Sequence, residues 1–237
     1  MLRAVPLILA LTALSFFATG CGSSNSSQVR FVHAIRDGGP LDIEVNATKV
    51  FTNVAFLGFQ PASGYTKVSS GSVTVAGLTT GTTTQVFSST ARLGSGQYTL
   101  IATGSESGTN GAGVNLLSIS DNNAAPATGN VEFRVIDASQ TGGTVDIYIL
   151  SNPVSSGIQP PATISGLAYT QASGYISLPY NSAGSGYTMY VTSAGTTNPL
   201  FSQTLNTPTG SIRTLVLTDV QNGGSMNPVA LELSDLN

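Results

Sequence analysis

The sequence repeats itself, and this constrains its folding more than any other feature. Matching blocks lie roughly 104 to 114 residues apart, and the spacing grows only in small steps along the chain. Such spacing arises when the loops of a duplicated unit differ in length, so we predict two copies of one unit of about 100 residues. The matching blocks are 30–34 with 134–138, 38–45 with 142–149, 62–65 with 172–175, 86–88 with 200–202, and 117–121 with 231–235.

The duplication predicts a division of the chain into two domains. The first is expected at 28–123, the second at 131–237, and the connection at 124–130. Because this linker is short, the two domains cannot separate far, and we expect them to be in contact.

The local pattern in both copies is typical of β-strands. Residues 41–45 and 145–149 alternate apolar and polar side chains, and paired glycines such as 38–39 and 142–143 mark turns. Beyond the N-terminal region no stretch of 12 residues has helical apolar spacing. The predicted fold is therefore all-β: two tandem immunoglobulin-like β-sandwich domains of roughly seven strands each, following a lipoprotein signal peptide.

The N-terminus has the pattern of a secretory signal. One cation, Arg3, precedes an apolar stretch at 4–17, and small residues lead to Cys21. The segment around Gly20 and Cys21 resembles a lipobox, which implies cleavage between these two residues, lipidation of Cys21 and a flexible tether at 21–27 after a signal peptide at 1–20. With Gly22 rather than Asp after the cysteine, the expected location is the bacterial cell envelope, lipid-anchored at the periplasmic or cell-surface face of the outer membrane. An ordinary signal peptide or an uncleaved anchor is the alternative.

Composition excludes several classes of function. Only 8% of the residues are charged, compared with roughly 25% in an average soluble domain. A net charge of -3 and a pI of about 4.9 argue against nucleic-acid binding. One Cys excludes an internal disulfide and a cysteine-based zinc site, and one His leaves little acid/base equipment at neutral pH. No cofactor, catalytic residue or metal site is predicted, and the oligomeric state stays open.

The opening of each repeat resembles a known family. Residues 29–34, 40–45, 50–56 and 62–65 together look like the prokaryotic lipoprotein family called domain of unknown function 4397. The likeness extends over most of the chain after the signal, once per repeat, and is better in the first copy. It implies paired extracytoplasmic β domains and no established activity.

A few polar residues recur or stand out. Asp42 and Asp146 occupy equivalent positions, and we expect them to cap backbone amides, with a metal or acid/base pair as the alternative. His33, opposite Asp137 in the second copy, is expected to be structural. The acid and amide turns at 121–123 and 219–223 are expected to be turn chemistry, with weak Ca²⁺ binding as the alternative.

Aromatic residues recur at matching places as well. Tyr65 matches Tyr175, and Phe59 matches Tyr169. Recurrence in a duplicated unit indicates packing first, and the alternative is an exposed platform for a glycan or protein ligand.

These observations predict a non-enzymatic, membrane-anchored module for adhesion, ligand presentation or spacing, with the membrane as partner through Cys21 and a protein or glycan as surface ligand. One alternative is an extracytoplasmic carbohydrate-acting or ester hydrolase that uses carboxylates such as Asp37, Asp42 or Asp137. Another is a structural component of the envelope or matrix.

Overall fold

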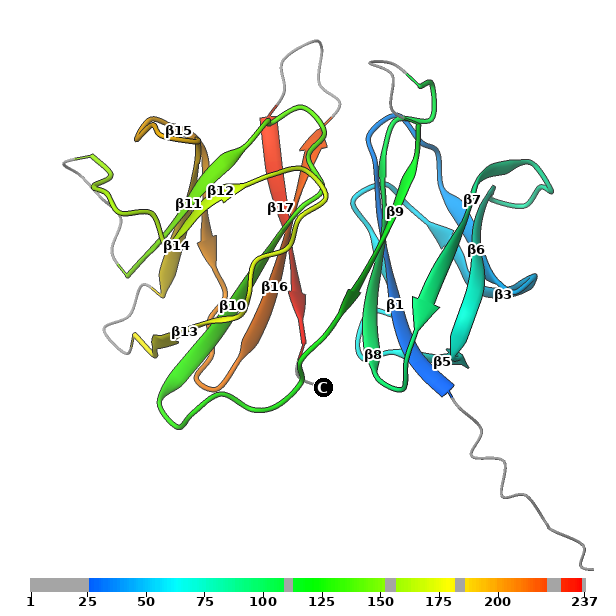
Figure 1. The fold of residues 1–237 in the computed structure, drawn as a ribbon, viewed down its shortest axis with the longest axis horizontal. Helices are drawn as coiled ribbons and strands as arrows, with labels where there is room; N and C mark the ends of the chain where they lie inside the picture. Colours follow the sequence, from blue (N-terminus) through cyan, green and yellow to red (C-terminus); the bar gives the residue numbers. More distant parts are fainter. Residues whose placement is uncertain (1–25, 109–112, 152–156, 182–185, 221–226, 236–237) are drawn as a thin grey trace, which may run out of the picture.

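The computed structural model describes residues 26–108, 113–151, 157–181, 186–220 and 227–235. Within these ranges every regular element is a β-strand, and none of them contains a helix that could span a bilayer. The strands form four sheets arranged in sandwich-like layers, two in each half of the molecule (Figure 1).

The first half contains strands β1 to β9. One sheet has the order β4-β1-β8-β9 with β5 also paired to β1, and the other has the order β3-β2-β6-β7. The strands are β1 (Ser26–Ile35), β2 (Leu41–Val45), β3 (Thr48–Val54), β4 (Phe59–Gln60), β5 (Thr66–Ser69), β6 (Gly71–Thr79), β7 (Gln85–Leu93), β8 (Gln97–Gly104) and β9 (Asn115–Ser120).

The second half contains strands β10 to β17 in the same arrangement. Its sheets have the orders β13-β10-β16-β17 and β12-β11-β14-β15, and β10 pairs parallel to β16 as β1 does to β8. The strands are β10 (Asn130–Asp137), β11 (Val145–Leu150), β12 (Ile164–Leu167), β13 (Ile176–Pro179), β14 (Tyr187–Ser193), β15 (Pro199–Leu205), β16 (Ile212–Val220) and β17 (Asn227–Ser234).

Each half has its own core between its two sheets. Strand β6 belongs to the sheet of the first half that lies away from the second half. Its Val73 and Val75 are buried whereas Ser72 and Thr74 are exposed, as expected when one face of a sheet meets the core and the other meets water. Strand β1 differs because it is buried on both faces. One of its faces covers the core of the first half, and the other faces the second half.

The N-terminal predictions fall mostly outside the described residues. Cys21, Gly20 and the signal peptide lie there, as does the expected tether up to residue 25. Ser26 and Ser27, expected in the tether, belong to β1 and pair with Ser69 and Val68 of β5. The linker ends one residue earlier than expected, because β10 begins at residue 130.

Candidate functional site

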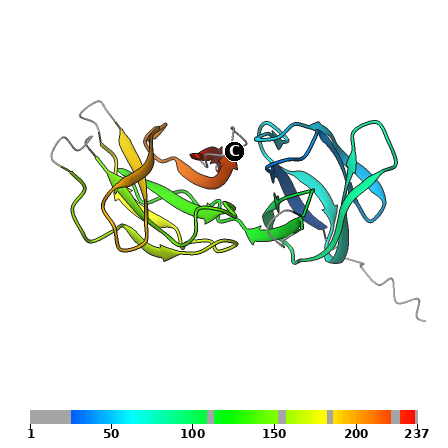
Figure 2. The same ribbon diagram turned by 90° about the horizontal axis from the view of Figure 1, so that it is seen from above.

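The two halves meet through one sheet from each. Strands β1, β8 and β9 face β10, β16 and β17 across a junction in the middle of the molecule (Figures 1 and 2). An apolar cluster with members from both halves fills part of it. Its buried members are Val32, Ala34, Ile101, Ile136, Ala138, Val216 and Leu233.

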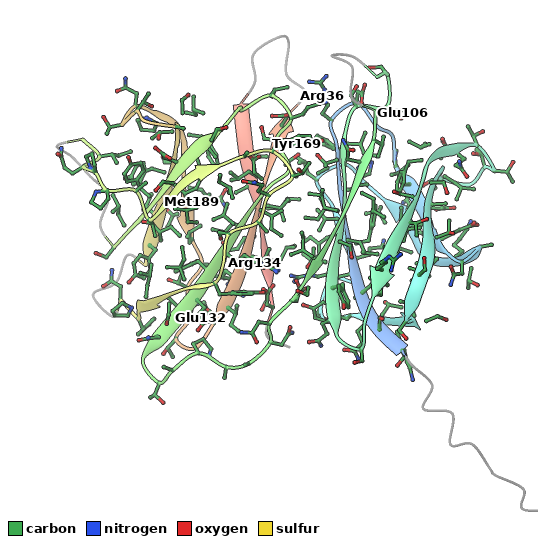
Figure 3. The ribbon with its side chains drawn as sticks, in the orientation of Figure 1. Arg36, Glu106, Glu132, Arg134, Tyr169 and Met189 are labelled. Atoms are coloured by element: carbon green, nitrogen blue, oxygen red, sulfur yellow. The ribbon has the colours of Figure 1, made fainter. Side chains whose placement is uncertain are left out.

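Two arginines lie in this junction, one from each half. Arg30 on β1 donates to Asp235 with 2.5 Å between Nη2 and Oδ1, and Arg134 on β10 donates to Asp121 at the same distance (Figure 3 labels Arg134). Each arginine therefore pairs with the carboxylate of the opposite half. The arginine side chains are 3% and 2% exposed, and both carboxylates are fully buried.

Asp121 is held by groups of both halves. From its own half, Tyr65 and Thr99 donate their hydroxyls to Oδ2 at 2.8 and 2.7 Å. From the other half, the guanidinium of Arg134 donates to Oδ1 of Asp121. Arg30, which belongs to the same half as Asp121, lies 3.4 Å from this carboxylate. Since a buried carboxylate is costly without partners, this degree of pairing is what allows Asp121 to be buried.

Asp235 of the second half has an equivalent set of partners. Tyr175 and Thr214 donate to its Oδ2 at 2.7 and 2.6 Å, and Arg134 lies 3.6 Å away. Burial raises the pKa of the Tyr175 phenol above its usual range. The phenol therefore stays neutral and acts as a hydrogen-bond donor. We call Arg30, Arg134, Asp121 and Asp235, with these hydroxyls, the junction network.

The recurring tyrosines belong to this network. Arg30 stacks over the Tyr65 ring with 5.3 Å to its centroid, and Arg134 stacks over Tyr175 at 4.7 Å. The rings of Tyr65 and Tyr175 therefore contact the arginines, and the hydroxyls of both tyrosines bind the buried carboxylates. The other recurring pair has a different environment: Phe59 packs against the apolar cluster, and the Tyr169 hydroxyl accepts a hydrogen bond from Asn115 of the first half.

A groove of about 460 Å³ opens beside the network. The first half contributes Phe59, the residues 61–64 and the edge of Arg30, and the second half contributes Glu232 and Ser234 of β17. The volume is within the range of small-ligand sites. The groove combines an aromatic ring and a proline with hydroxyl and carboxylate groups, and it exists only while the two halves are in contact.

Glu232 is the titratable group on the second-half wall of this groove. Its Oε1 lies 3.0 Å from Nε of Arg213, and its Oε2 accepts the backbone N–H of Asn206 at 3.1 Å. Burial raises its pKa, and these two partners act in the opposite direction. Held in this way, Glu232 offers the groove a fixed hydrogen-bond acceptor.

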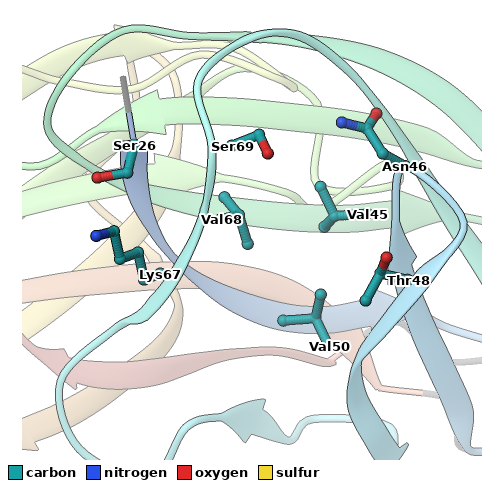
Figure 4. A pocket seen from close by; sticks show the side chains of 8 residues that line it. All are labelled: Ser26, Val45, Asn46, Thr48, Val50, Lys67, Val68 and Ser69. Carbon is teal, nitrogen blue, oxygen red and sulfur yellow. The ribbon is translucent and has the colours of Figure 1, made fainter. Parts of the chain in front are cut away.

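A second hollow, of about 410 Å³, lies at the end of the first half where the chain enters β1 (Figure 4). Val45, Val50 and Val68 form its apolar wall, and Lys67 lies on its polar side. Further polar lining comes from Ser26, Asn46, Thr48 and Ser69.

Asp42 and Asp146 both accept hydrogen bonds from backbone amides. Asp42 accepts from Asn53 at 2.9 Å, and a hydrogen bond from Lys49 at 2.7 Å contributes most to lowering its pKa to about 2. Asp146 accepts the amides of Gly166 and Gly195 at 2.7 and 2.8 Å.

Asp37 is engaged in a similar way. Burial would raise its pKa, but the hydroxyls of Ser107 and Ser105 and two backbone amides donate to its carboxylate, and the net result is a pKa below the usual range. A carboxylate with this many donors is a poor general base.

His33 and Asp137 lie near the ends of the first strands of the two halves and are fully buried. Each accepts the backbone N–H of the residue two positions later: Ile35 donates to His33 Nδ1 at 3.2 Å, and Ser139 donates to Asp137 Oδ1 at 2.9 Å. Burial lowers the pKa of His33, whereas burial, together with nearby Asp219, raises that of Asp137 to about 7. Neither side chain is accessible to a substrate in this conformation.

The turn residues considered for Ca²⁺ are already engaged. Asp121 lies in the junction network, and Asp219 accepts the hydroxyls of Ser139 and Thr141 at 2.5 and 2.6 Å. Residues 221–223 lie outside the described ranges. Within those ranges no three His, Cys, Asp or Glu side chains are grouped for a metal ion.

The junction network is not among the features predicted from the sequence. The signal was present, since Arg30 and Arg134, like Asp121 and Asp235, fall at equivalent places in the matching blocks. In a chain with so few charged residues, an arginine and an aspartate that both recur at equivalent positions favour ion pairs between them.

Comparison with known proteins gives the family. The model described as Domain of unknown function (DUF4397) matches residues 27–148, just over half of the chain. The chain belongs to this family. The matched stretch contains nearly all of the first half and continues through the linker into β10 and most of β11. None of the curated proteins matches the chain.

The likeness to solved structures is weak. One is titled "Alpha-glucan binding by a streptococcal virulence factor", with 13% identity and a TM-score of 0.25 over 80% of this chain and 93% of that one. A product complex of the pneumococcal glycogen-degrading virulence factor SpuA has 11% identity and a TM-score of 0.25, over 82% of this chain and 21% of that one. The Bacillus anthracis TIE protein has 13% identity and a TM-score of 0.22, over 89% and 43%.

Proposed function

We propose that the protein is a non-catalytic, lipid-anchored binding module of the bacterial cell envelope, built from two tandem copies of this family domain joined as one body. The observation that carries the proposal is the junction groove. Its walls come from both halves, and the buried pairs of Arg30 with Asp235 and of Arg134 with Asp121 fix those walls relative to one another. A preorganised groove loses little conformational entropy when a ligand binds.

The chemistry of the groove suits a protein loop or a glycan. The Phe59 ring and Pro61 supply an apolar surface, and Ser63, Glu232 and Ser234 supply hydrogen-bonding groups. Aromatic rings with adjacent polar groups are the usual means of holding a sugar ring or an aromatic side chain. Of the three carboxylates considered for a hydrolase, Asp42 and Asp137 are buried, and Asp37 is held by several donors, which favours binding over catalysis.

Ligand binding is tested by screening the full-length protein on a glycan array and against envelope proteins. Phe59→Ala should weaken binding of any ligand found by about tenfold or more, because it removes the aromatic surface of the groove. Leu200→Ala is the matched control, since Leu200 is an exposed apolar residue, at 43%, on β15. Equal binding by the wild type and Phe59→Ala would contradict the groove as the binding site, and Val68→Ala would then test the hollow in Figure 4.

Anchoring is tested separately. Metabolic labelling with a fatty-acid analogue should label the wild-type protein and not Cys21→Ala, and membrane fractions should lose the variant. Label retained in Cys21→Ala would contradict lipidation at this position. A hydrolase would instead be indicated by turnover of a glycan or ester panel that is lost in Asp37→Asn, Asp42→Asn or Asp137→Asn.

A further inference from the structure

The contacts of the two arginines in the junction network come in matched pairs. Nε of Arg30 donates to Thr99 at 2.8 Å, and Nε of Arg134 donates to Thr214 at 3.1 Å. Nη1 of each arginine donates to the carbonyl that precedes the partner carboxylate: Arg30 to Ser234 at 2.8 Å and Arg134 to Ser120 at 2.7 Å. The two halves therefore present the same groups to one another in the same arrangement.

The apolar part of the junction has the same property. Val32 and Ala34 of β1 correspond to Ile136 of β10 and to Ala138, the residue that follows β10, and both pairs are buried in one cluster. The matches differ by at most one methylene group. A surface that meets its own equivalent in this way is isologous, which is the geometry of a two-fold symmetric dimer.

We infer that the junction surface is self-complementary, and that the partner it fits is a second copy of this chain. When the two halves of a chain separate, each can pair with the opposite half of another chain, which gives a dimer with exchanged halves. The short linker favours pairing within one chain by keeping the local concentration of the second half high. Exchange is favoured where copies are crowded or where pairing within the chain is weakened.

The exchanged dimer would contain the junction twice. Each of its grooves would take Phe59 and residues 61–64 from one chain, and Glu232 and Ser234 from the other. Exchange therefore preserves the groove and doubles the number of grooves in one particle, which would allow bivalent binding.

Two charge reversals test this in the full chain. Arg30→Asp places two carboxylates opposite one another in its own junction, and Asp235→Arg places two guanidinium groups together. If the two variants exchange halves, one junction sets the new carboxylate of the first variant against the new guanidinium of the second, which restores a pair of opposite charges. The other junction of the same dimer then contains only native residues.

Equal amounts of the two variants are unfolded together, refolded and measured by light scattering and native mass spectrometry. We expect a heterodimer of twice the monomer mass in the mixture, absent from either variant alone, and at least tenfold more abundant than in a mixture of Arg30→Asp with wild type.

The double variant Arg30→Asp/Asp235→Arg is the control, because it restores the pair within one chain and should remain monomeric. If that double variant folds and the mixture yields no heterodimer, the inference is wrong. If the double variant does not fold, the reversed pair is not accepted, and exchange is then tested with Arg30→Leu and Asp235→Leu, where failure to form a heterodimer contradicts the inference equally.

Discussion

The two halves share a scaffold but end their first strands with different chemistry. His33 and Asp137 are equivalent, both are buried, and both accept the backbone N–H two residues later. His33 also binds the carbonyl of Gly39 through Nε2 at 2.9 Å, whereas Oδ2 of Asp137 has no hydrogen-bond partner among the described residues. Either side chain can thus accept the same backbone N–H, while the response of stability to pH depends on which one is present.

The largest loss of stability should come from replacing the buried arginines that the two halves share. Arg30→Leu and Arg134→Leu each remove the nearer of the two cations around a buried carboxylate, and the remaining arginine lies 3.4 to 3.6 Å away, so each should lower the free energy of unfolding by about 3 to 5 kcal/mol. Chemical denaturation measures both, with Arg92→Leu, at an exposed position, as the control that should change little. A large loss in only one of the two arginine variants would contradict the equivalence of the two halves.

The next largest effect is a pH dependence of stability that Asp137 gives to the second half and that the first half lacks. Because the pKa of Asp137 is raised to about 7, the folded protein retains a proton that the unfolded chain loses near pH 4. Stability should therefore fall as the pH rises from about 4 to 7 and level off above that. Asp137→Asn removes this fall and should be more stable than the wild type at pH 8, by on the order of 1 to 3 kcal/mol.

His33 should make stability depend on pH in the opposite direction. With its pKa lowered by burial, the unfolded chain takes up a proton that the folded protein does not, so this contribution is lost as the pH falls below about 6.5. Denaturation midpoints of Asp137→Asn and His33→Gln, measured from pH 4 to 8, should each lose one of these two slopes. Unchanged slopes in both variants would contradict the assignment.

The smallest effect concerns Lys49. It binds Asp42 at 2.7 Å but is 45% exposed, and the described contacts of Asp146, the equivalent of Asp42, include no cation. Exposed ion pairs contribute little, so Lys49→Met should cost less than about 1 kcal/mol in the free energy of unfolding. Asp42→Asn should cost more, because the backbone amides that donate to it lose a charged acceptor. If denaturation shows Lys49→Met to be the more costly of the two, the first half depends on a pair that the second half lacks.

Much of the fold could be predicted from the sequence because strand periodicity is local. The stretch expected at 41–45 is strand β2, and that expected at 145–149 lies in β11, Val145–Leu150. The prediction of roughly seven strands per half was low, since the described ranges contain nine in the first half and eight in the second. Strand β4 has only two residues, too few to produce a periodic pattern.

The site was harder to predict, because it depends on how the halves meet. Strand β1 is buried along most of its length rather than on alternate residues, which is the pattern of a strand covered on both faces. The apolar residues that flank Arg30 and Arg134, repeated in both copies, could have indicated the junction. The groove could not be predicted, because Phe59 and Glu232 approach one another only through the pairing of two separate sheets.

If the junction network joins the two halves, they should stay together after the linker is cut. A protease site placed within 124–129 is cleaved in the folded protein, and the products are separated by size-exclusion chromatography. We expect the two fragments to elute together at the position of the intact chain, and to separate when Arg30→Leu and Arg134→Leu are combined. Separation of the fragments from the otherwise unmodified protein would contradict the claim that the junction network joins the halves into one body.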